Sequence, residues 1–172
     1  YTIISQTKIS RGANRKGIIA ACVFHACKEC KVPRSTNELA HIFGIEQKVM
    51  TKGCKNYTEI MRISKSDKTR ISNPKSITMD DFIERFSHAL SLTPIDIQNI
   101  LRIADKCSQL KIINDNTPPG MASGCIYLFI KFYGLDISKK QISEISKISE
   151  VTINKCYKKL ENNIDIMDFL TS

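Results

Sequence analysis

The sequence is 172 residues long, 42% hydrophobic and without tryptophan, which suits one or two small globular domains with a hydrophobic core. No apolar run approaches the roughly 20 residues that a membrane-spanning helix needs, and no signal-peptide pattern opens the chain. The formal net charge of +9 predicts an acidic partner, most often nucleic acid, although a generally basic soluble protein would carry the same charge.

An internal repeat organises the sequence. Placing Cys22 over Cys125 gives an offset of 103 residues, and this offset aligns residues 5–57 with residues 108–160 without a gap. Identical pairs include Gln6 with Gln109, Lys28 with Lys131, and Ser35 with Ser138. The sequence therefore predicts two tandem copies of one helical unit, with matching apolar positions buried alike. These positions are Cys22, Leu39, Ile42, Ile45 and Met50 in the first copy, and Cys125, Ile142, Ile145, Ile148 and Ile153 in the second.

The first copy, predicted over residues 1–62, lacks its opening helices. By the offset, residues 1–9 correspond to residues 104–112, which places the start of this sequence inside the second helix of the copy. An uncovered hydrophobic core is unfavourable in water, so we expect the natural protein to be longer or another surface to cover the gap. Residues 63–78 follow as a predicted flexible linker, since this stretch is polar, rich in Ser and Lys and interrupted by Asn73-Pro74.

The second copy, predicted over residues 79–172, contains five helices. The first spans residues 79–90 behind a Thr78 cap, and the second opens at Thr93-Pro94 and runs to about residue 110. The third follows the segment NTPPG and is apolar nearly all round, so it should be the buried central helix. Gly134 stands where this helix should stop.

The last two predicted helices form a helix-turn-helix. Ser138 caps the fourth helix, KKQISEIS, and Ser149 caps the fifth after a turn through Lys147 and Ile148. Residues 139–159 contain six lysines and two acidic residues. Lysines can neutralise phosphates, asparagine can pair with an adenine edge, and valine can contact a thymine methyl group. A solvated basic helix would have the same pattern, and the residues alone do not separate these two interpretations.

Nothing in the sequence predicts an enzyme. Seven cysteines are scattered through helical segments, which is typical of small buried hydrophobic residues in a reducing compartment. Cys27 and Cys30 form a lone CxxC, which supplies only half the donors of a zinc site. His25, His41 and His88 have no nucleophile with an orienting carboxylate nearby in the sequence, and neither glycine-rich phosphate-binding motif is present.

Two repeats that each end in a short helix, a tight turn and a capped basic helix resemble the C-terminal core of transcription initiation factor IIB. The resemblance rests on RKGIIAACVFHACKECKVPRSTNELAHIFGI in the first copy, and on DFIERF, PPGMASGCIYL and ISKKQISEISKISEVTINKCYKKL in the second. It covers nearly the whole sequence except the linker, and it implies an all-α fold of two tandem five-helix cyclin-fold repeats. The zinc ribbon and reader segment of that family have no counterpart in this sequence, so no cofactor is expected here.

The resemblance also implies DNA contacts. In the family, the second-repeat helix-turn-helix recognises the element just upstream of the TATA box through a valine, a threonine and an arginine. Val151 and Thr152 match the first two, and Asn154 stands at the arginine position, which would change the preferred base from guanine to adenine. Thr51 and Lys52 stand where the first repeat of the family contacts the minor groove downstream of TATA with a glycine and an arginine. Five further lysines complete the predicted DNA-binding set: Lys55, Lys139, Lys140, Lys155 and Lys158.

The resemblance predicts a promoter-bound scaffold with promoter DNA, the TATA-binding protein and RNA polymerase as partners. We expect a monomer without a membrane partner, located in the nucleus or, if the abundant Ile, Lys, Asn and Ser reflect a large DNA virus, in the host cytoplasm or virion. One alternative is a cyclin-type module that regulates a kinase through an exposed apolar groove. Another is a redox or metal protein that uses Cys27 and Cys30.

Overall fold

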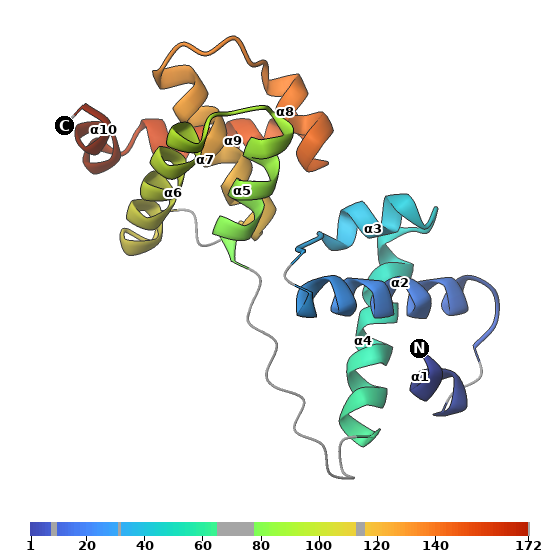
Figure 1. Ribbon diagram of the computed structural model, residues 1–172. Coiled ribbons are helices and arrows are strands. Elements are labelled where there is room, and N and C mark those ends of the chain that lie inside the picture. The colour runs from blue at the N-terminus through green and yellow to red at the C-terminus, as the bar shows by residue number, and fades with distance from the viewer. Residues whose placement is uncertain (8–9, 31, 65–77, 113–115, 172) are drawn as a thin grey trace. The chain divides into compact units, whose positions relative to one another are not determined.

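The computed structural model describes residues 1–7, 10–30, 32–64, 78–112 and 116–171, and every regular element in these ranges is a helix. The predicted all-α class is therefore confirmed. The chain divides into two compact units, Tyr1–Ser76 and Ile77–Ser172 (Figure 1). Most of the predicted linker, residues 65–77, lies outside the described residues. None of the described helices is long and apolar enough to cross a membrane.

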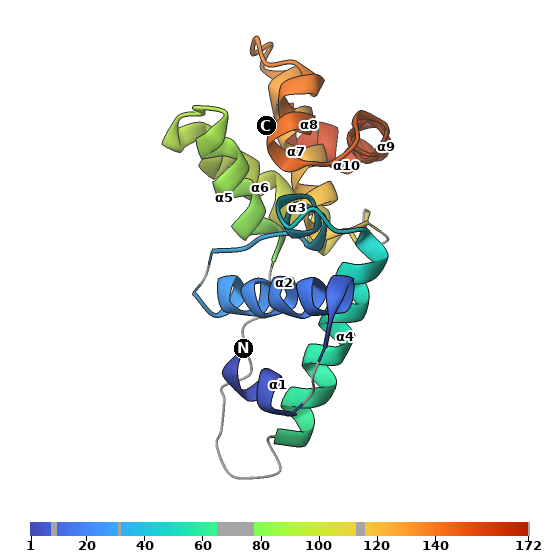
Figure 2. The ribbon, with the colours of Figure 1, turned by 90° about the vertical axis from the view of Figure 1, so that its right-hand side faces the viewer.

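The first unit contains four described helices: α1 (Thr2–Thr7), α2 (Gly12–Glu29), α3 (Thr36–Ile42) and α4 (Gln47–Ser64). The long helices α2 and α4 cross each other, and both views of the ribbon show α3 near one end of α4 and α1 near the other (Figures 1 and 2). Ser35 caps α3 reciprocally: its Oγ accepts the Glu38 N–H at 3.1 Å, and its own N–H donates to Glu38 Oε2 at 2.7 Å. The apolar residues form two small clusters, one around Met50 and one around Ile18.

The described part of the second unit contains the five predicted helices and one more: α5 (Met79–Ala89), α6 (Pro94–Gln109), α7 (Pro118–Phe132), α8 (Lys139–Ser146), α9 (Glu150–Glu161) and α10 (Ile164–Thr171). α7 is central, as predicted, because α5, α6, α8 and α9 all pack against it. Its residues Cys125 and Ile126 are completely buried, and Phe129 is 1% exposed. One continuous apolar cluster extends through the whole unit.

The 103-residue offset found in the sequence also aligns the helices. α2 and α7 end 103 residues apart, and α4 and α9 begin 103 residues apart. α4 then runs on without interruption, whereas the corresponding segment of the second unit breaks between α9 and α10. Asn163 explains the break, because its Oδ1 accepts the Ile166 N–H at 3.2 Å and so caps a new helix. This cap was the sequence signal for the unpredicted α10.

The predicted burial is confirmed at six of the ten matching apolar positions, is partial at three and is wrong at Ile42. Leu39, Met50, Cys125, Ile142, Ile148 and Ile153 are buried, and Cys22, Ile45 and Ile145 are half-buried. Ile42 was predicted to be buried and is 68% exposed. In the second unit α5 packs against α7 and α8, and the described part of the first unit has no counterpart of α5. The same difference leaves Val23 37% exposed, whereas its counterpart Ile126 is fully buried.

A glycine allows the closest approach of helices in each unit. Where α2 crosses α4, a Cβ on Gly53 would lie 2.1 Å from the carbonyl oxygen of Gly17. Where α7 crosses α9, a Cβ on Gly124 would lie 2.5 Å from the Cβ of Cys156. Gly53 and Cys156 are equivalent by the offset, so the glycine is on the later helix in the first unit and on the central helix in the second. In both units the two backbones are too close for a side chain at that glycine.

Substitution of Gly124 by alanine should lower the free energy of unfolding by about 1–3 kcal/mol, because α7 and α9 must separate to admit the methyl group. Gly120→Ala in the same helix is the matched control, since a Cβ there meets no atom closer than 3.3 Å. That control should be neutral or gain up to about 1 kcal/mol from helix propensity. Urea unfolding of both variants, followed by circular dichroism, measures the difference; equal stabilities would contradict the close crossing.

Candidate nucleic-acid interface

Side chains of α8 fix the turn that leads to α9. Lys147 ends α8 with a φ of 57°, in the left-handed region, and Gly44 adopts the same φ at the equivalent position of the first unit. The N–H of Ile148 donates to Oγ of the buried Ser146 at 3.2 Å. The Ser143 hydroxyl donates to the carbonyl of Ile148 at 2.7 Å. The polar groups of this backbone are therefore satisfied inside the motif, and the predicted helix-turn-helix has a defined path.

A polar and aromatic cluster joins α9 to α7. The rings of Tyr127 and Tyr157 are in edge-to-face contact, with centroids 5.0 Å apart. The Tyr157 hydroxyl donates a hydrogen bond to Glu161, and this bond, together with burial, raises the pKa of Tyr157 to about 12. Lys158 Nζ donates to the other carboxylate oxygen of Glu161 at 2.6 Å. Hydrogen bonds from Lys158 and Tyr157 lower the pKa of Glu161, so this carboxylate is ionised at neutral pH.

The three predicted base-contacting residues differ in their surroundings. Val151 is 79% exposed in the first turn of α9. Thr152 is half-buried, and its hydroxyl lies 2.9 Å from Oγ of Ser149, which also accepts the Thr152 N–H as the helix cap. Asn154 is half-buried, and its Oδ1 accepts a hydrogen bond from Lys139 Nζ at 3.2 Å. Val151 is therefore the most accessible of the three side chains.

The predicted phosphate-binding lysines of the second unit fall into two groups. Lys140 and Lys155 are exposed. Lys158 is also exposed, but its ammonium is already paired with Glu161. Lys139 is half-buried, and its Nζ lies 5.6 Å from the centroid of the Tyr127 ring. The structure adds Lys147, which is exposed at the turn between the helices.

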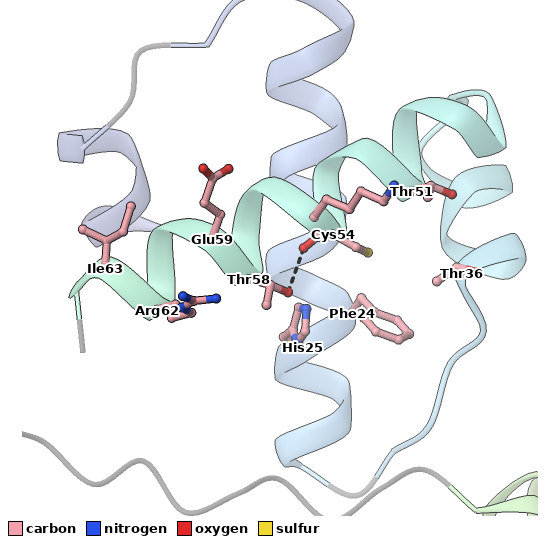
Figure 3. A pocket seen from close by; sticks show the side chains of 10 residues that line it. Phe24, His25, Thr36, Thr51, Cys54, Thr58, Glu59, Arg62 and Ile63 are labelled. Atoms are coloured by element: carbon pink, nitrogen blue, oxygen red, sulfur yellow. Dashed lines mark hydrogen bonds between the residues drawn. The ribbon is translucent and has the colours of Figure 1, made fainter. Parts of the chain in front are cut away.

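The predicted residues of the first unit lie along α4. Thr51, Lys52 and Lys55 are all exposed, and the Thr51 hydroxyl donates to the carbonyl of Gln47 at 2.9 Å. Thr51 and Lys55 also line a groove of about 730 Å³ formed by α2, α3 and α4. Figure 3 shows Phe24 and His25 on one wall of this groove and residues of α4 along the other. Lys52 is not among the residues that line it.

This groove was not predicted, although the internal repeat contains its signal. By the 103-residue offset, smaller side chains in the first unit replace larger ones in the second. The replacements are Thr36 for Lys139, Cys54 for Tyr157, and Thr58 for Glu161. The larger side chains make the cluster on α9, so the groove lies at the position that this cluster fills in the second unit. His25 stacks on Tyr57 beside it, with ring centroids 4.0 Å apart.

The cysteines have varied surroundings. Cys107, Cys125 and Cys156 are buried in the second unit, which agrees with their predicted role as small hydrophobic residues. Cys27 is half-buried, and Cys30 is exposed at the end of α2, so the predicted burial is wrong for Cys30. Among the described residues, no group of three or more His, Cys, Asp or Glu side chains is arranged to hold a metal ion.

The sequence of both units matches one known family, the Transcription factor TFIIB repeat, over residues 1–61 and 72–163. The chain belongs to the TFIIB repeat family. The first TFIIB repeat thus includes α1 to α3 and most of α4, and the second includes α5 to α9. The helix-turn-helix lies inside the second TFIIB repeat, whereas α10 begins just after it.

Individual relatives match most of this chain. The chain is 36% identical over 152 residues to a transcription initiation factor IIB-like protein of Acanthamoeba polyphaga mimivirus, covering 88% of this chain and 33% of that protein. It is 27% identical over 156 residues to a transcription initiation factor IIB of Methanococcus aeolicus, covering 91% of this chain and 44% of that protein. The TFIIB repeats of this chain therefore span about a third to less than half of these relatives.

Proposed function

We propose that this chain is the core of a transcription initiation factor IIB-like protein that binds the TATA-binding protein and the promoter DNA flanking the TATA box. In this role it is a scaffold for assembly of the initiation complex, and no covalent bond is made or broken. The observation that carries the proposal is the exposed surface of the helix-turn-helix within a TFIIB repeat. There Val151, 79% exposed, shares α9 with the exposed Lys155, and Lys140 and Lys147 lie on the preceding helix and turn.

The exposed surface suits a DNA major groove. In helix-turn-helix proteins, residues near the start of the second helix contact base edges while surrounding cations neutralise phosphates. Val151 stands in the first turn of α9, where its methyl groups can contact a thymine methyl group. Lys140, Lys147 and Lys155 supply the surrounding positive charge, since all three are exposed.

The two repeats supply contacts on both sides of the TATA box in this proposal. In the first repeat, Thr51 and Lys52 are exposed near the start of α4, the helix equivalent to α9. When one repeat is bound, the linker holds the other repeat at a high effective concentration near its own DNA segment. Contacts that are individually weak therefore give high overall affinity. We further propose that RNA polymerase is a partner of the assembled complex, in the nucleus or, in a viral system, in the host cytoplasm or virion.

One observation favours a second candidate function, a cyclin-type module that regulates a kinase. The groove between α2, α3 and α4 has Phe24, Cys54 and Ile63 in its lining and about 730 Å³ of space, which is room for several apolar side chains of a protein partner. A pull-down with this chain that retains a kinase, together with no detectable binding of the chain to promoter DNA, would favour this candidate.

A gel shift on TATA-containing promoter DNA tests the proposed function. The chain should form a ternary complex with DNA and the TATA-binding protein, and it should bind the same DNA much more weakly alone. The physical reason is that protein and DNA contacts add in the ternary complex. A DNA of the same length without a TATA box is the control. Absence of a ternary complex at micromolar concentrations of the chain would contradict the proposal.

Lysine substitutions should affect the salt dependence of this complex unequally. Lys155 has no ion-pair partner among the described residues. If this lysine neutralises one phosphate, Lys155→Ala should reduce by about 0.9 the magnitude of the salt slope, which is the slope of the logarithm of the binding constant against the logarithm of the salt concentration. Lys158→Ala should lower it by less, because Lys158 is paired with Glu161. Glu161→Gln should raise the slope by releasing Lys158. The slopes can be measured between roughly 50 and 200 mM salt. Equal reductions of the slope in the two lysine variants would contradict this ranking.

A further inference from the structure

We propose that Lys139 is a positioning residue that makes Asn154 a hydrogen-bond donor to DNA, so that α9 prefers guanine over adenine at the base pair that Asn154 contacts. The inference rests on the proposed function and specifies the base preference of the same surface. It differs from the expectation drawn from asparagine alone, which is adenine.

The position of the Lys139 ammonium is fixed from two sides. Its Nζ donates to Oδ1 of Asn154 at 3.2 Å in a partly buried contact between α8 and α9. The same Nζ lies 5.6 Å from the centroid of the Tyr127 ring, within cation–π range. Tyr127 in turn packs edge-to-face on Tyr157, which donates to Glu161. The lysine that holds Asn154 is therefore itself held by the cluster that joins α7 to α9.

This contact determines which atoms of Asn154 are available to a base. A carboxamide has one acceptor oxygen with two lone pairs and one NH₂ group with two donor hydrogens. Pairing with adenine uses both, since Nδ2 donates to N7 while Oδ1 accepts from the N6 amino group. The Lys139 ammonium takes one lone pair of Oδ1 and places its positive charge beside the other, which disfavours the approach of an amino group there, whereas Nδ2 makes no hydrogen bond within the described part of the chain. Asn154 thus presents its donor group.

A side chain that offers its donor group more readily than its acceptor distinguishes the bases by their major-groove edges. Guanine presents two acceptors, N7 and O6, and thymine presents the acceptor O4. Adenine and cytosine each present an amino group, which would face the NH₂ of Asn154 as donor against donor. The ammonium of Lys139 adds positive charge beside this amide, which further favours the two acceptors of guanine. Guanine is therefore the expected base, with thymine second.

The first repeat has no equivalent arrangement. The positions of Lys139 and Asn154 are occupied there by Thr36 and Thr51. Both threonine hydroxyls are bonded to Gln47: Thr36 Oγ1 accepts from its Nε2 at 3.1 Å, and Thr51 Oγ1 donates to its carbonyl at 2.9 Å. The lysine-bonded amide is thus a feature of the second repeat alone within the described residues.

The test selects bound DNA from a library randomised upstream of a TATA box, in complex with the TATA-binding protein. Wild type should select guanine at one position. Lys139→Met keeps the aliphatic stem and frees Oδ1, so adenine should gain at least about fivefold over guanine at that position. Lys140→Met is the matched control: it removes the same charge from the next residue and should weaken binding without changing the selected base.

A second variant decides the matter if Lys139→Met fails to fold or bind. Asn154→Asp keeps an acceptor for Lys139 and loses the donor group, so selection should move from guanine toward cytosine, which donates from N4. Selection of adenine by wild type, or an unchanged base in either variant at that position, would overturn the inference while leaving the proposed function intact. Failure of wild type to form any complex would instead overturn the proposed function, and the inference with it.

Discussion

The crossing of α7 and α9 at Gly124 determines where the candidate DNA-binding surface lies. Because the two backbones are too close for a side chain at Gly124, α9 is held against the central helix along Ile153, Cys156 and Leu160, which are buried. The opposite side of the helix, which includes Val151, then faces solvent. The first unit has an equally close helix crossing, with Gly53 on the later helix, α4. Helix α4 is thereby fixed on α2 as α9 is fixed on α7.

Contacts within the second repeat then decide which of its polar side chains a partner can use. Glu161 pairs with Lys158, and Lys139 bonds to Asn154, so two of the lysines and the asparagine are already engaged. A count of basic residues in the sequence gives all of these lysines equal weight. In the folded protein, some are already bonded to other side chains and others are not. The positive charge left for phosphates is carried by exposed lysines on α8, the turn and α9. In the first repeat smaller residues replace much of this cluster, and a groove is present there instead.

Local sequence signals predicted most of the fold. The offset between the copies and the serine caps at positions 138 and 149 are local in the chain, and the helix bounds follow them. The exposure of Ile42 was within reach of the sequence, because the offset already indicated that the opening helices of the first copy are missing, but burial was predicted from the repeat alone. The bond between Lys139 and Asn154 joins residues fifteen positions apart on two helices, so spacing alone could not show it. The extra helix α10 was predictable from the Asn163 cap, but it lies beyond residue 160, where the aligned repeat ends.

The central claim is that the two repeats hold promoter DNA on both sides of the TATA box through α4 and α9. Hydroxyl-radical footprinting of the complex of TATA-binding protein and promoter, with and without this chain, tests it most directly. The claim predicts that the chain adds protection both upstream and downstream of the protection given by the TATA-binding protein alone. A ternary complex whose footprint is identical to that of the TATA-binding protein alone would contradict it, because the chain would then bind through protein contacts without touching the flanking DNA.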